Sequence, residues 1–257
     1  MRKSEPAARA ALLLLIVCVS CKPAPKPAAT RAASGPQVRA TVVTIKTTIQ
    51  PENRTTTHTL VIAGNRARST DEHDTWRLFD TKANTVTFVD DIAKTIRTEP
   101  LAAIVKRRRE TLAKTLPPHY PRAQLVRAGA RRAIAGVNAE QSVITAGAYR
   151  RELWLAEHPS IPRGLFAMLH ASDVLSSPLA PMMRVADDAL VATRAFPMLD
   201  HAELAIGKEK MVIDRAVVSV EQRDVPEAMV TAPKGYRDVT PRANTERGTR
   251  NTERRLR

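Results

Sequence analysis

The chain has 257 residues, of which 43% are apolar and only 4% are aromatic, and its formal net charge is +15. This apolar content is enough for a sizeable core and excludes a chain that is disordered throughout. The positive charge favours anionic partners such as lipid headgroups, acidic polysaccharide or nucleic acid, without choosing among them. The only cysteines, Cys18 and Cys21, lie near the start, which excludes a disulfide or a cysteine metal site further along the chain.

The first twenty residues have the pattern of a bacterial export signal. Arg2 and Lys3 form a positive start, and an apolar run follows from Ala10 to Val19. Its length fits a secretory signal and is below the roughly 20 residues that a membrane-spanning helix needs. The run ends in "VCVSC", which resembles a lipobox, the motif whose last cysteine receives a diacylglycerol. We therefore predict a signal peptide over residues 1–20 and lipid attachment at Cys21, with ordinary signal-peptidase cleavage nearby as the competing interpretation.

Two segments flank the part of the chain that has a folding pattern. Residues 21–37 are rich in proline and small residues, so they cannot continue a helix and have little to bury. They predict a semi-extended tether between a membrane and a domain over residues 38–239. Residues 240–257 are polar and basic, and they predict a disordered tail.

Alternating β-branched residues predict antiparallel strands in the first part of the domain. The connections are short, and Gly64–Asn65 has the residues of a hairpin turn. The five predicted strands are Val38–Ile49, Thr55–Ile62, Arg66–Ser69, Thr75–Asp80 and Thr85–Val89.

Helical patterns interrupt the strands twice. Leu101–Leu116 has apolar residues at helical spacing and ends at prolines. The second interruption comprises Gly164–Ser177 and an apolar stripe from Met182 to Leu190. The remaining strand patterns are Ile134–Val137, Gln141–Thr145, Tyr149–Leu155, Ala202–Ile206 and Met211–Arg223. This order of strands, inserted helices and final strands predicts an α+β fold.

The chain carries no catalytic signature. The cluster Asp71–Asp74 has the residue types of a metal site, but four consecutive positions do not converge on one ion, so we interpret it as a solvated turn. Asp187 and Asp188 diverge by about 100° on a helix, which indicates a wet helix face. Neither a serine-nucleophile motif nor a glycine-rich phosphate loop occurs. The other histidines are scattered, at His58, His119, His158, His170 and His201. We predict no enzymatic activity, no metal and no cofactor.

The basic run Lys106–Arg109 lies within the first predicted helix. Most of it faces away from the apolar stripe, although Arg108 lies close enough to need to extend its stem along the stripe. Aromatic residues that would stack on nucleobases are not beside it. The run therefore predicts a solvated face, with contact to lipid headgroups as the alternative and no nucleic-acid partner.

The stretches "VTIKTTI", "LFDTKANTVTFVD", "ELWLAEHPSIP" and "VVSVEQRDVPEAMVTAPKGYRDV" resemble a family of bacterial periplasmic lipoproteins that carries a domain of unknown function and is similar to the carriers LolA and LolB. The resemblance covers about residues 38–239. It implies a curved antiparallel sheet, an open half-barrel, with inserted helices covering the concave face. In the carriers this arrangement holds acyl chains. The implied location is the cell envelope, lipid-anchored on the periplasmic side, in the outer membrane.

Two functions stay open at this point. The first is a binding protein whose half-barrel holds a hydrophobic ligand such as a lipid or acyl chain. Met168, Met182 and Met183 suit irregular apolar ligands, and core packing is the alternative for each. The second is a structural or interaction protein of the envelope with a filled core and no ligand, whose basic face and tail contact anionic lipid or a protein partner.

Overall fold

The computed structural model describes residues 35–70, 75–115, 121–172, 189–191, 195–206 and 208–241. All of them belong to one structural unit, which begins at Gly35. The predicted signal peptide (1–20) and all but the last residues of the predicted tether (21–37) lie outside this described part, so both stay predictions. The last tether residue, Gln37, is already in the first strand.

In the part of the chain that the structure describes, twelve strands form a single sheet. Their bounds are β1 (Gln37–Gln50), β2 (Arg54–Ala63), β3 (Arg66–Thr70), β4 (Thr75–Asp80), β5 (Thr85–Asp90), β6 (Thr95–Pro100), β7 (Gln124–Ile134), β8 (Val137–Ala146), β9 (Tyr149–Ala156), β10 (Phe196–Ile206), β11 (Glu209–Pro226) and β12 (Arg237–Asp238). The described part of the chain is therefore mostly β.

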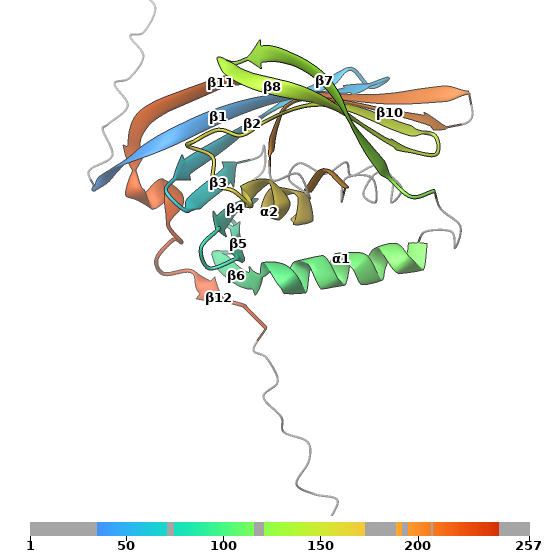
Figure 1. Cartoon of the computed structure of the whole chain (residues 1–257). Helices are drawn as coiled ribbons and strands as arrows, with labels where there is room; N and C mark the ends of the chain where they lie inside the picture. Colours follow the sequence, from blue (N-terminus) through green and yellow to red (C-terminus); the bar gives the residue numbers. More distant parts are fainter. Residues whose placement is uncertain are drawn as a thin grey trace, which may run out of the picture. The chain divides into compact units, whose positions relative to one another are not determined.

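The strand order makes the sheet open rather than closed. It runs β12-β6-β5-β4-β3-β2-β1-β11-β10-β9-β8-β7, so β12 and β7 form the two edges. All neighbours are antiparallel except β12 and β6, which are parallel. The long central pair β1–β11 joins the first and last parts of the chain. Figure 1 shows β1, β2 and β7 to β11 in one broad layer, with β3 to β6 turning away below it.

The five strands predicted for the first part are confirmed as β1 to β5, and Gly64–Asn65 forms the turn between β2 and β3. The strand β6 is not predicted. Its sequence TIRTEP has one large apolar residue, Ile96, and its most buried position is taken by Glu99. The sequence of β6 therefore does not alternate between apolar and polar residues. The strand nevertheless pairs with β5 along its whole length.

The predicted strand Ile134–Val137 is wrong. Ile134 ends β7 and Val137 begins β8, and the two residues between them form a hairpin turn. Ala135 and Gly136 both have positive φ, 48° and 78°, as the primed hairpin turns require. The rest of β7 lacks an alternating pattern because nearly all of its residues are exposed at the edge of the sheet. The other strand predictions lie within β8 to β11.

Two α-helices are described, α1 (Leu101–Thr115) and α2 (Leu165–Ala171). The first matches its prediction closely. The second confirms only the beginning of the helix predicted over Gly164–Ser177, because residues 173–177 lie outside the described part. Of the stripe Met182–Leu190, only Ala189 and Leu190 are described, and both are helical. None of the described helices is long and apolar enough to cross a membrane.

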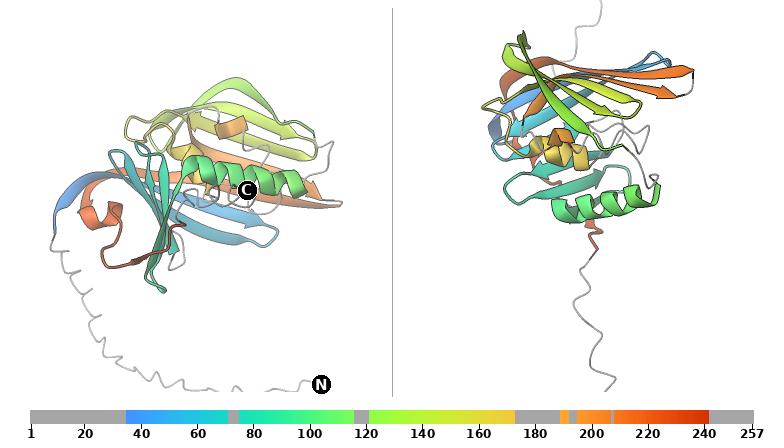
Figure 2. Two further views of the ribbon diagram at one scale, coloured as in Figure 1. Left: turned by 90° about the horizontal axis from the view of Figure 1, so that it is seen from below. Right: turned by 45° about the vertical axis from the view of Figure 1, so that its right-hand side comes forward.

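The main core joins α2 and α1 to one face of the sheet. On α2, Leu165, Met168 and Leu169 are at most 1% exposed, and they belong to the same apolar cluster as residues of β2, β4 and β9. Figure 2 shows α2 beneath the broad layer of strands. From α1, Ile104 enters this core. Space between α2 and the sheet is therefore filled by side chains.

The last described residues are held against the sheet. The OH of Tyr236 donates to Asp91 at 2.7 Å, and the indole N–H of Trp76 donates to the same carboxylate at 3.0 Å. The backbone N–H of Thr98 donates to the Thr240 hydroxyl at 2.9 Å. The ordered domain thus extends through Thr240, one residue into the tail predicted over 240–257; residues 242–257 lie outside the described part.

Candidate functional site

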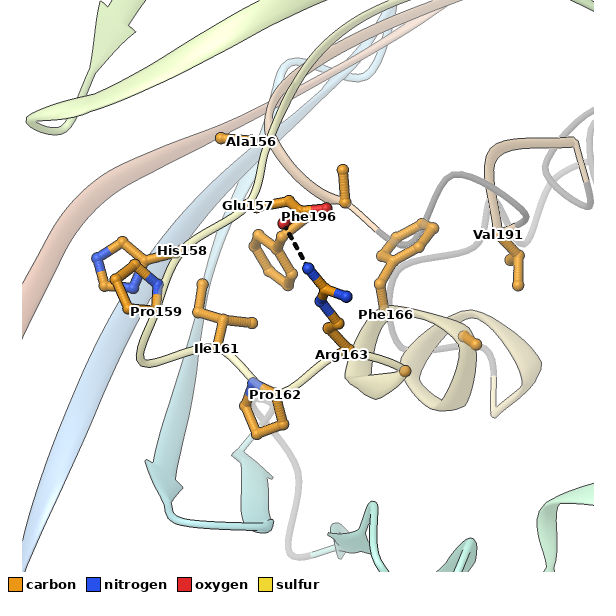
Figure 3. A pocket seen from close by; sticks show the side chains of 13 residues that line it. Ala156, Glu157, His158, Pro159, Ile161, Pro162, Arg163, Phe166, Val191 and Phe196 are labelled. Atoms are coloured by element: carbon orange, nitrogen blue, oxygen red, sulfur yellow. Dashed lines mark hydrogen bonds and ion pairs between the residues drawn. The ribbon is translucent and has the colours of Figure 1, made fainter.

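An apolar pocket opens where the end of β9 meets the beginning of α2 and of β10. Its volume is about 800 Å³, within the range of about 300–1,000 Å³ that is typical of small-molecule sites. Its largest apolar side chains are Ile161, Phe166, Val191 and Phe196. The rings of Phe166 and Phe196 meet edge to face with their centroids 6.3 Å apart, and Figure 3 shows both rings at the pocket. We call this site the apolar pocket.

The loop that follows β9, residues 157–164, forms one wall of the apolar pocket. The backbone N–H of Ile161 donates to the carbonyl of His158 at 3.0 Å, which closes a tight turn. The side chain of Gln222 on β11 donates to the Ser160 hydroxyl at 3.2 Å. The wall is thus fixed by its own backbone and by the central part of the sheet.

A charged pair lies at the apolar pocket. The guanidinium of Arg163 donates to a carboxylate oxygen of Glu157 at 3.0 Å, and both side chains are exposed. Figure 3 shows the pair among the apolar lining residues. An exposed pair contributes only about 0–1 kcal/mol to stability. It can therefore separate at small cost when a ligand with its own charge approaches.

A second pocket, of about 530 Å³, adjoins the first. Ala156, Glu157 and Ala195 line both. The walls of the second pocket come from β7, β8 and the end of β9, and its arginines are Arg127, Arg131 and Arg132. We call it the basic pocket.

Positive charge exceeds negative charge around the two pockets. Together they are lined by four arginines and two glutamates, a formal excess of two positive charges. One glutamate is the partner of Arg163, and the other, Glu140, has a carboxylate oxygen 3.7 Å from the Arg131 guanidinium. The remaining arginines, Arg127 and Arg132, have no carboxylate partner within the described part of the chain. The basic pocket therefore favours an anion.

A different charged cluster is buried in the core, and it joins β9, β10 and β11. Asp200 lies between Arg151 and Arg215. The Nε of Arg151 donates to Asp200 Oδ1 at 2.6 Å, its Nη2 bonds to Oδ2, and Nη1 of Arg215 donates to Oδ2 at 2.9 Å. Only about 10 Å³ of space lies beside Asp200 and Arg215. The cluster thus ties three strands together and has no room for a ligand.

Two opposing effects act on the pKa of Asp200. Burial would raise the pKa, because the carboxylate loses its hydration. The positive charges and hydrogen bonds of Arg151, and then those of Arg215, outweigh burial, so the pKa is lowered. Asp200 is therefore a charged structural partner rather than a group that exchanges protons near neutral pH.

A histidine with two carboxylate partners lies on β10, near the surface. His201 Nδ1 is 2.6 Å from Asp214 Oδ1, and its Nε2 is 2.9 Å from Glu203 Oε1. Glu203 also pairs with Lys210 at 2.6 Å. Burial would lower the pKa of His201, but the hydrogen bonds to Asp214 and Glu203 outweigh it, and the pKa is raised. Since both ring nitrogens have partners, neither faces an open position.

The raised pKa predicts a pH-dependent contribution of His201 to stability. A folded-state pKa above the ordinary value of 6.5 means that protonated His201 stabilises the fold fully below that value, and that this stabilisation is lost as the pH rises through the folded-state pKa. We expect the difference in unfolding free energy between wild type and His201→Asn to be larger at low than at high pH. Urea denaturation at about pH 5.5 and pH 9 measures it; an equal difference at both would contradict the assignment.

Several predicted residues lie outside the described part of the chain. These are Cys21, the cluster Asp71–Asp74, His119, and the pair Asp187–Asp188. Met182 and Met183 lie outside it as well. Lipid attachment at Cys21 therefore stays a prediction. Among the described residues, no group of three or more His, Cys, Asp or Glu side chains is placed to hold a metal ion.

The other residues considered in the sequence lie at different places in the structure and form no common site. Met168 is buried in the main core rather than exposed to a pocket. His158 lines the apolar pocket. His170 is buried on α2, and its ring centroid is 6.1 Å from that of Phe166. His58 lies on β2, in register with Ile45 of β1.

The basic run Lys106–Arg109 has partners within the domain. Arg107 binds Glu99 of β6 at 2.6 Å, which fastens α1 to the sheet. Arg108 is partly buried and donates to the carbonyl of His170 on α2 at 3.4 Å. Part of the run therefore holds the helices in place, and is not simply a solvated face.

The sequence pattern did not identify the pockets or the two charged clusters. One signal for the buried cluster was present, since Arg151 and Asp200 occupy core-facing positions of alternating strands, where a charged residue requires a partner. No comparable signal marks the basic pocket. Its arginines lie on an exposed edge strand, where such residues are ordinary protection against edge pairing.

Comparisons with known proteins do not assign this chain to a family. No family model matches the chain, and no curated protein matches it. The predicted family of lipoproteins with a domain of unknown function therefore stays a prediction.

Three solved structures have a backbone fold that is partly similar to that of this chain. PNGF-II is 10% identical with a TM-score of 0.43, over 79% of this chain and 31% of that chain. MucB in complex with MucA(peri) is 13% identical with a TM-score of 0.35, over 79% and 57%. The LolA superfamily protein NE2245 from Nitrosomonas europaea is 11% identical with a TM-score of 0.27, over 78% and 92%.

This chain spans about a third of the PNGF-II chain and just over half of the MucB chain. All three TM-scores are below 0.5. A LolA superfamily protein is thus among the similar structures, as the predicted resemblance implies, at a score that carries no argument. The strand order by itself defines the fold as one open, mostly antiparallel sheet.

Proposed function

We propose that this protein binds the hydrocarbon chain of an amphiphile in the apolar pocket. The observation that carries the proposal is a space of about 800 Å³ with a wall of Ile161, Phe166, Val191 and Phe196. Burial of a chain against such a wall stabilises by about 0.8 kcal/mol per CH₂ group. The adjoining basic pocket offers a polar end to the same site.

The ligand position that we propose differs from the one that the sequence predicted. In the prediction, helices cover the concave face of a half-barrel and the ligand lies between them and the sheet. Leu165, Met168 and Leu169 fill the space beneath α2. We therefore propose that the ligand lies beside α2, between the loop 157–164 and the start of β10. We still propose that helices cover the concave face of the sheet.

The proposed anchor gives this binding a location. A diacylglycerol on Cys21 and a tether over residues 21–37 would hold the domain on the periplasmic side of the bacterial envelope, at the outer membrane. The net charge of +15 suits a surface of anionic lipid headgroups. The membrane is thus the proposed partner and the source of the ligand.

We propose that the protein acts by binding and catalyses no reaction. Support comes from the described ionisable groups with shifted pKa. Asp200 is buried between two arginines, and His201 has carboxylates at both ring nitrogens. Neither group faces the apolar or the basic pocket.

Filling the apolar pocket tests the proposal. Ala167 lines it and is partly exposed. We expect Ala167→Trp to weaken binding of dodecyl maltoside by about tenfold or more, because a tryptophan brings roughly 150–250 Å² of surface into the same space. Isothermal titration calorimetry below the micelle concentration, on the full chain, measures the change.

A matched variant controls for the added indole. Ala102 lies on the exposed side of α1, so Ala102→Trp adds the same side chain away from the pocket and should bind like the wild type. Equal binding by the wild type and both variants would place the ligand elsewhere. An absence of binding by the wild type would remove the proposed function.

A second candidate is an envelope protein that acts through its surface and holds no ligand. The filled space beneath α2 favours it, and so does the edge strand β7, which exposes three arginines. In this case dodecyl maltoside would not bind, and a protein partner would be recovered from envelope extracts by the wild type and lost when the arginines of β7 are replaced.

A further inference from the structure

We propose that the ligand of the apolar pocket is a phosphate-bearing lipid, whose headgroup binds Arg127 and Arg131 in the basic pocket. The inference rests on the proposed function and specifies the chemical class of its ligand. Its support comes from the register of β7, from the charge balance and from the row of side chains that joins the two pockets.

A bulge in β7 brings the two arginines together. Arg127 is paired with Ser142 of β8 and Arg131 with Glu140, so the five residues from Arg127 to Arg131 oppose only three residues of β8. Two residues that are two positions apart on a strand, as Ser142 and Glu140 are on β8, lie on the same face and about 6.8 Å apart. The backbones of their partners Arg127 and Arg131 therefore have a similar separation. Without the bulge, four positions along β7 would place these arginines about twice as far apart. Gly129, with φ 75°, lies within the bulge, in the left-handed region that favours glycine.

The spacing of these arginines suits a phosphate better than a carboxylate. One guanidinium fork fills both oxygens of a carboxylate. A phosphate monoester has three free oxygens and can accept from two guanidinium groups at once. Its charge of about −1.5 to −2 at neutral pH matches the formal excess of two positive charges around the pockets.

The basic pocket leads into the apolar pocket along one row of the sheet. Glu140, the partner of Arg131, is paired across β8 and β9 with Leu155. Leu155 lines the basic pocket, and the next residue, Ala156, lines both pockets. When the headgroup binds the arginines, the hydrocarbon chain of the lipid is therefore directed towards Phe166 and Phe196.

Arg132 adds a third positive charge with a fixed position. Its guanidinium lies over the ring of Trp154, 4.1 Å from the centroid. A cation–π contact leaves the edge N–H groups of the guanidinium available. Arg132 thus contributes to the field of the basic pocket while Arg127 and Arg131 make the direct contacts.

Four ligands with related structures test the inference on the full chain by isothermal titration calorimetry. They are dodecyl phosphate, dodecanoate, dodecyl maltoside and inorganic phosphate. We expect dodecyl phosphate to bind about tenfold or more tightly than dodecyl maltoside, since hydrogen bonds to charged groups are the strong ones. Dodecanoate should lie between them, and inorganic phosphate should bind more weakly than any of the three.

The variant Arg127→Gln/Arg131→Gln should lower the affinity for dodecyl phosphate to that for dodecyl maltoside and leave the latter unchanged. Arg150→Gln is the matched control, because Arg150 is an exposed arginine on β9 that lines neither pocket. It should leave all four affinities within roughly twofold of the wild type, as expected for an exposed charge.

The outcomes separate this inference from the proposed function. Equal binding of dodecyl phosphate and dodecyl maltoside by the wild type overturns the headgroup assignment and leaves the apolar pocket as a binding site. Binding of inorganic phosphate as tight as that of dodecyl phosphate overturns a lipid ligand. Retained preference for phosphate in the double variant overturns the role of Arg127 and Arg131. Failure of every dodecyl compound to bind overturns both proposals.

Discussion

Asp200→Asn is expected to lower the free energy of unfolding by about 3–5 kcal/mol, the cost of breaking a buried ion pair on one side. The substitution keeps the size of the side chain and removes the charge that faces Arg151 and Arg215. Both guanidinium groups lie in the core, where Arg151 is 1% exposed, and water cannot replace the lost carboxylate. Urea denaturation of the purified chain, followed by circular dichroism, measures the change.

The exposed pair between Arg39 and Asp224 provides the control. Its closest atoms are 3.6 Å apart and both side chains are more than 60% exposed. Asp224→Asn should therefore change the unfolding free energy by no more than about 1 kcal/mol. Equal, small effects of the two substitutions would show that the buried cluster contributes little to stability.

Cys21→Ala is expected to abolish incorporation of labelled palmitate and to release the protein from the membrane fraction. A cysteine directly after a small residue at the end of an apolar signal is the acceptor that a lipobox provides. Several acyl chains contribute roughly 0.8 kcal/mol for each buried methylene, so their loss removes a durable anchor. Metabolic labelling in a bacterial host, followed by fractionation, measures both effects.

Cys18→Ala is the matched control for the anchor. Cys18 precedes the predicted cleavage point and should leave with the signal, so this variant should keep the label and its membrane location. Equal labelling of the wild type and Cys21→Ala would contradict lipid attachment at Cys21. Loss of the label from both variants would show that Cys18 is needed for recognition of the signal.

The sequence predicted the parts of the fold whose pattern follows from local chemistry. Alternating β-branched residues identified β1, and glycine and asparagine marked the turn between β2 and β3. The pattern failed at β6, where Glu99 is buried and pairs with Arg97 and with Arg107 of α1. It also failed at β7, whose bulge and exposure remove the alternation.

The candidate site was out of reach for a different reason. Its apolar side chains come from the loop after β9, from α2, from the helical residues 189–191 and from the start of β10. An apolar residue that faces a ligand has the same sequence signature as one that faces the core. Met168 illustrates this, because its residue type suits a ligand site and the structure buries it in the core. Only the packing around each side chain distinguishes the two cases.

The antiparallel sheet with inserted helices follows from the sequence, because the periodicity of apolar residues matches the geometry of strands and helices. The lipobox-like end of the apolar opening is likewise a property of the sequence. Which charges are buried together depends on the folded chain, because Arg151, Asp200 and Arg215 meet only through the pairing of β9, β10 and β11. The position of the β7 arginines beside an apolar pocket also depends on the folded chain, since it requires a bulge and segments that are far apart in the sequence.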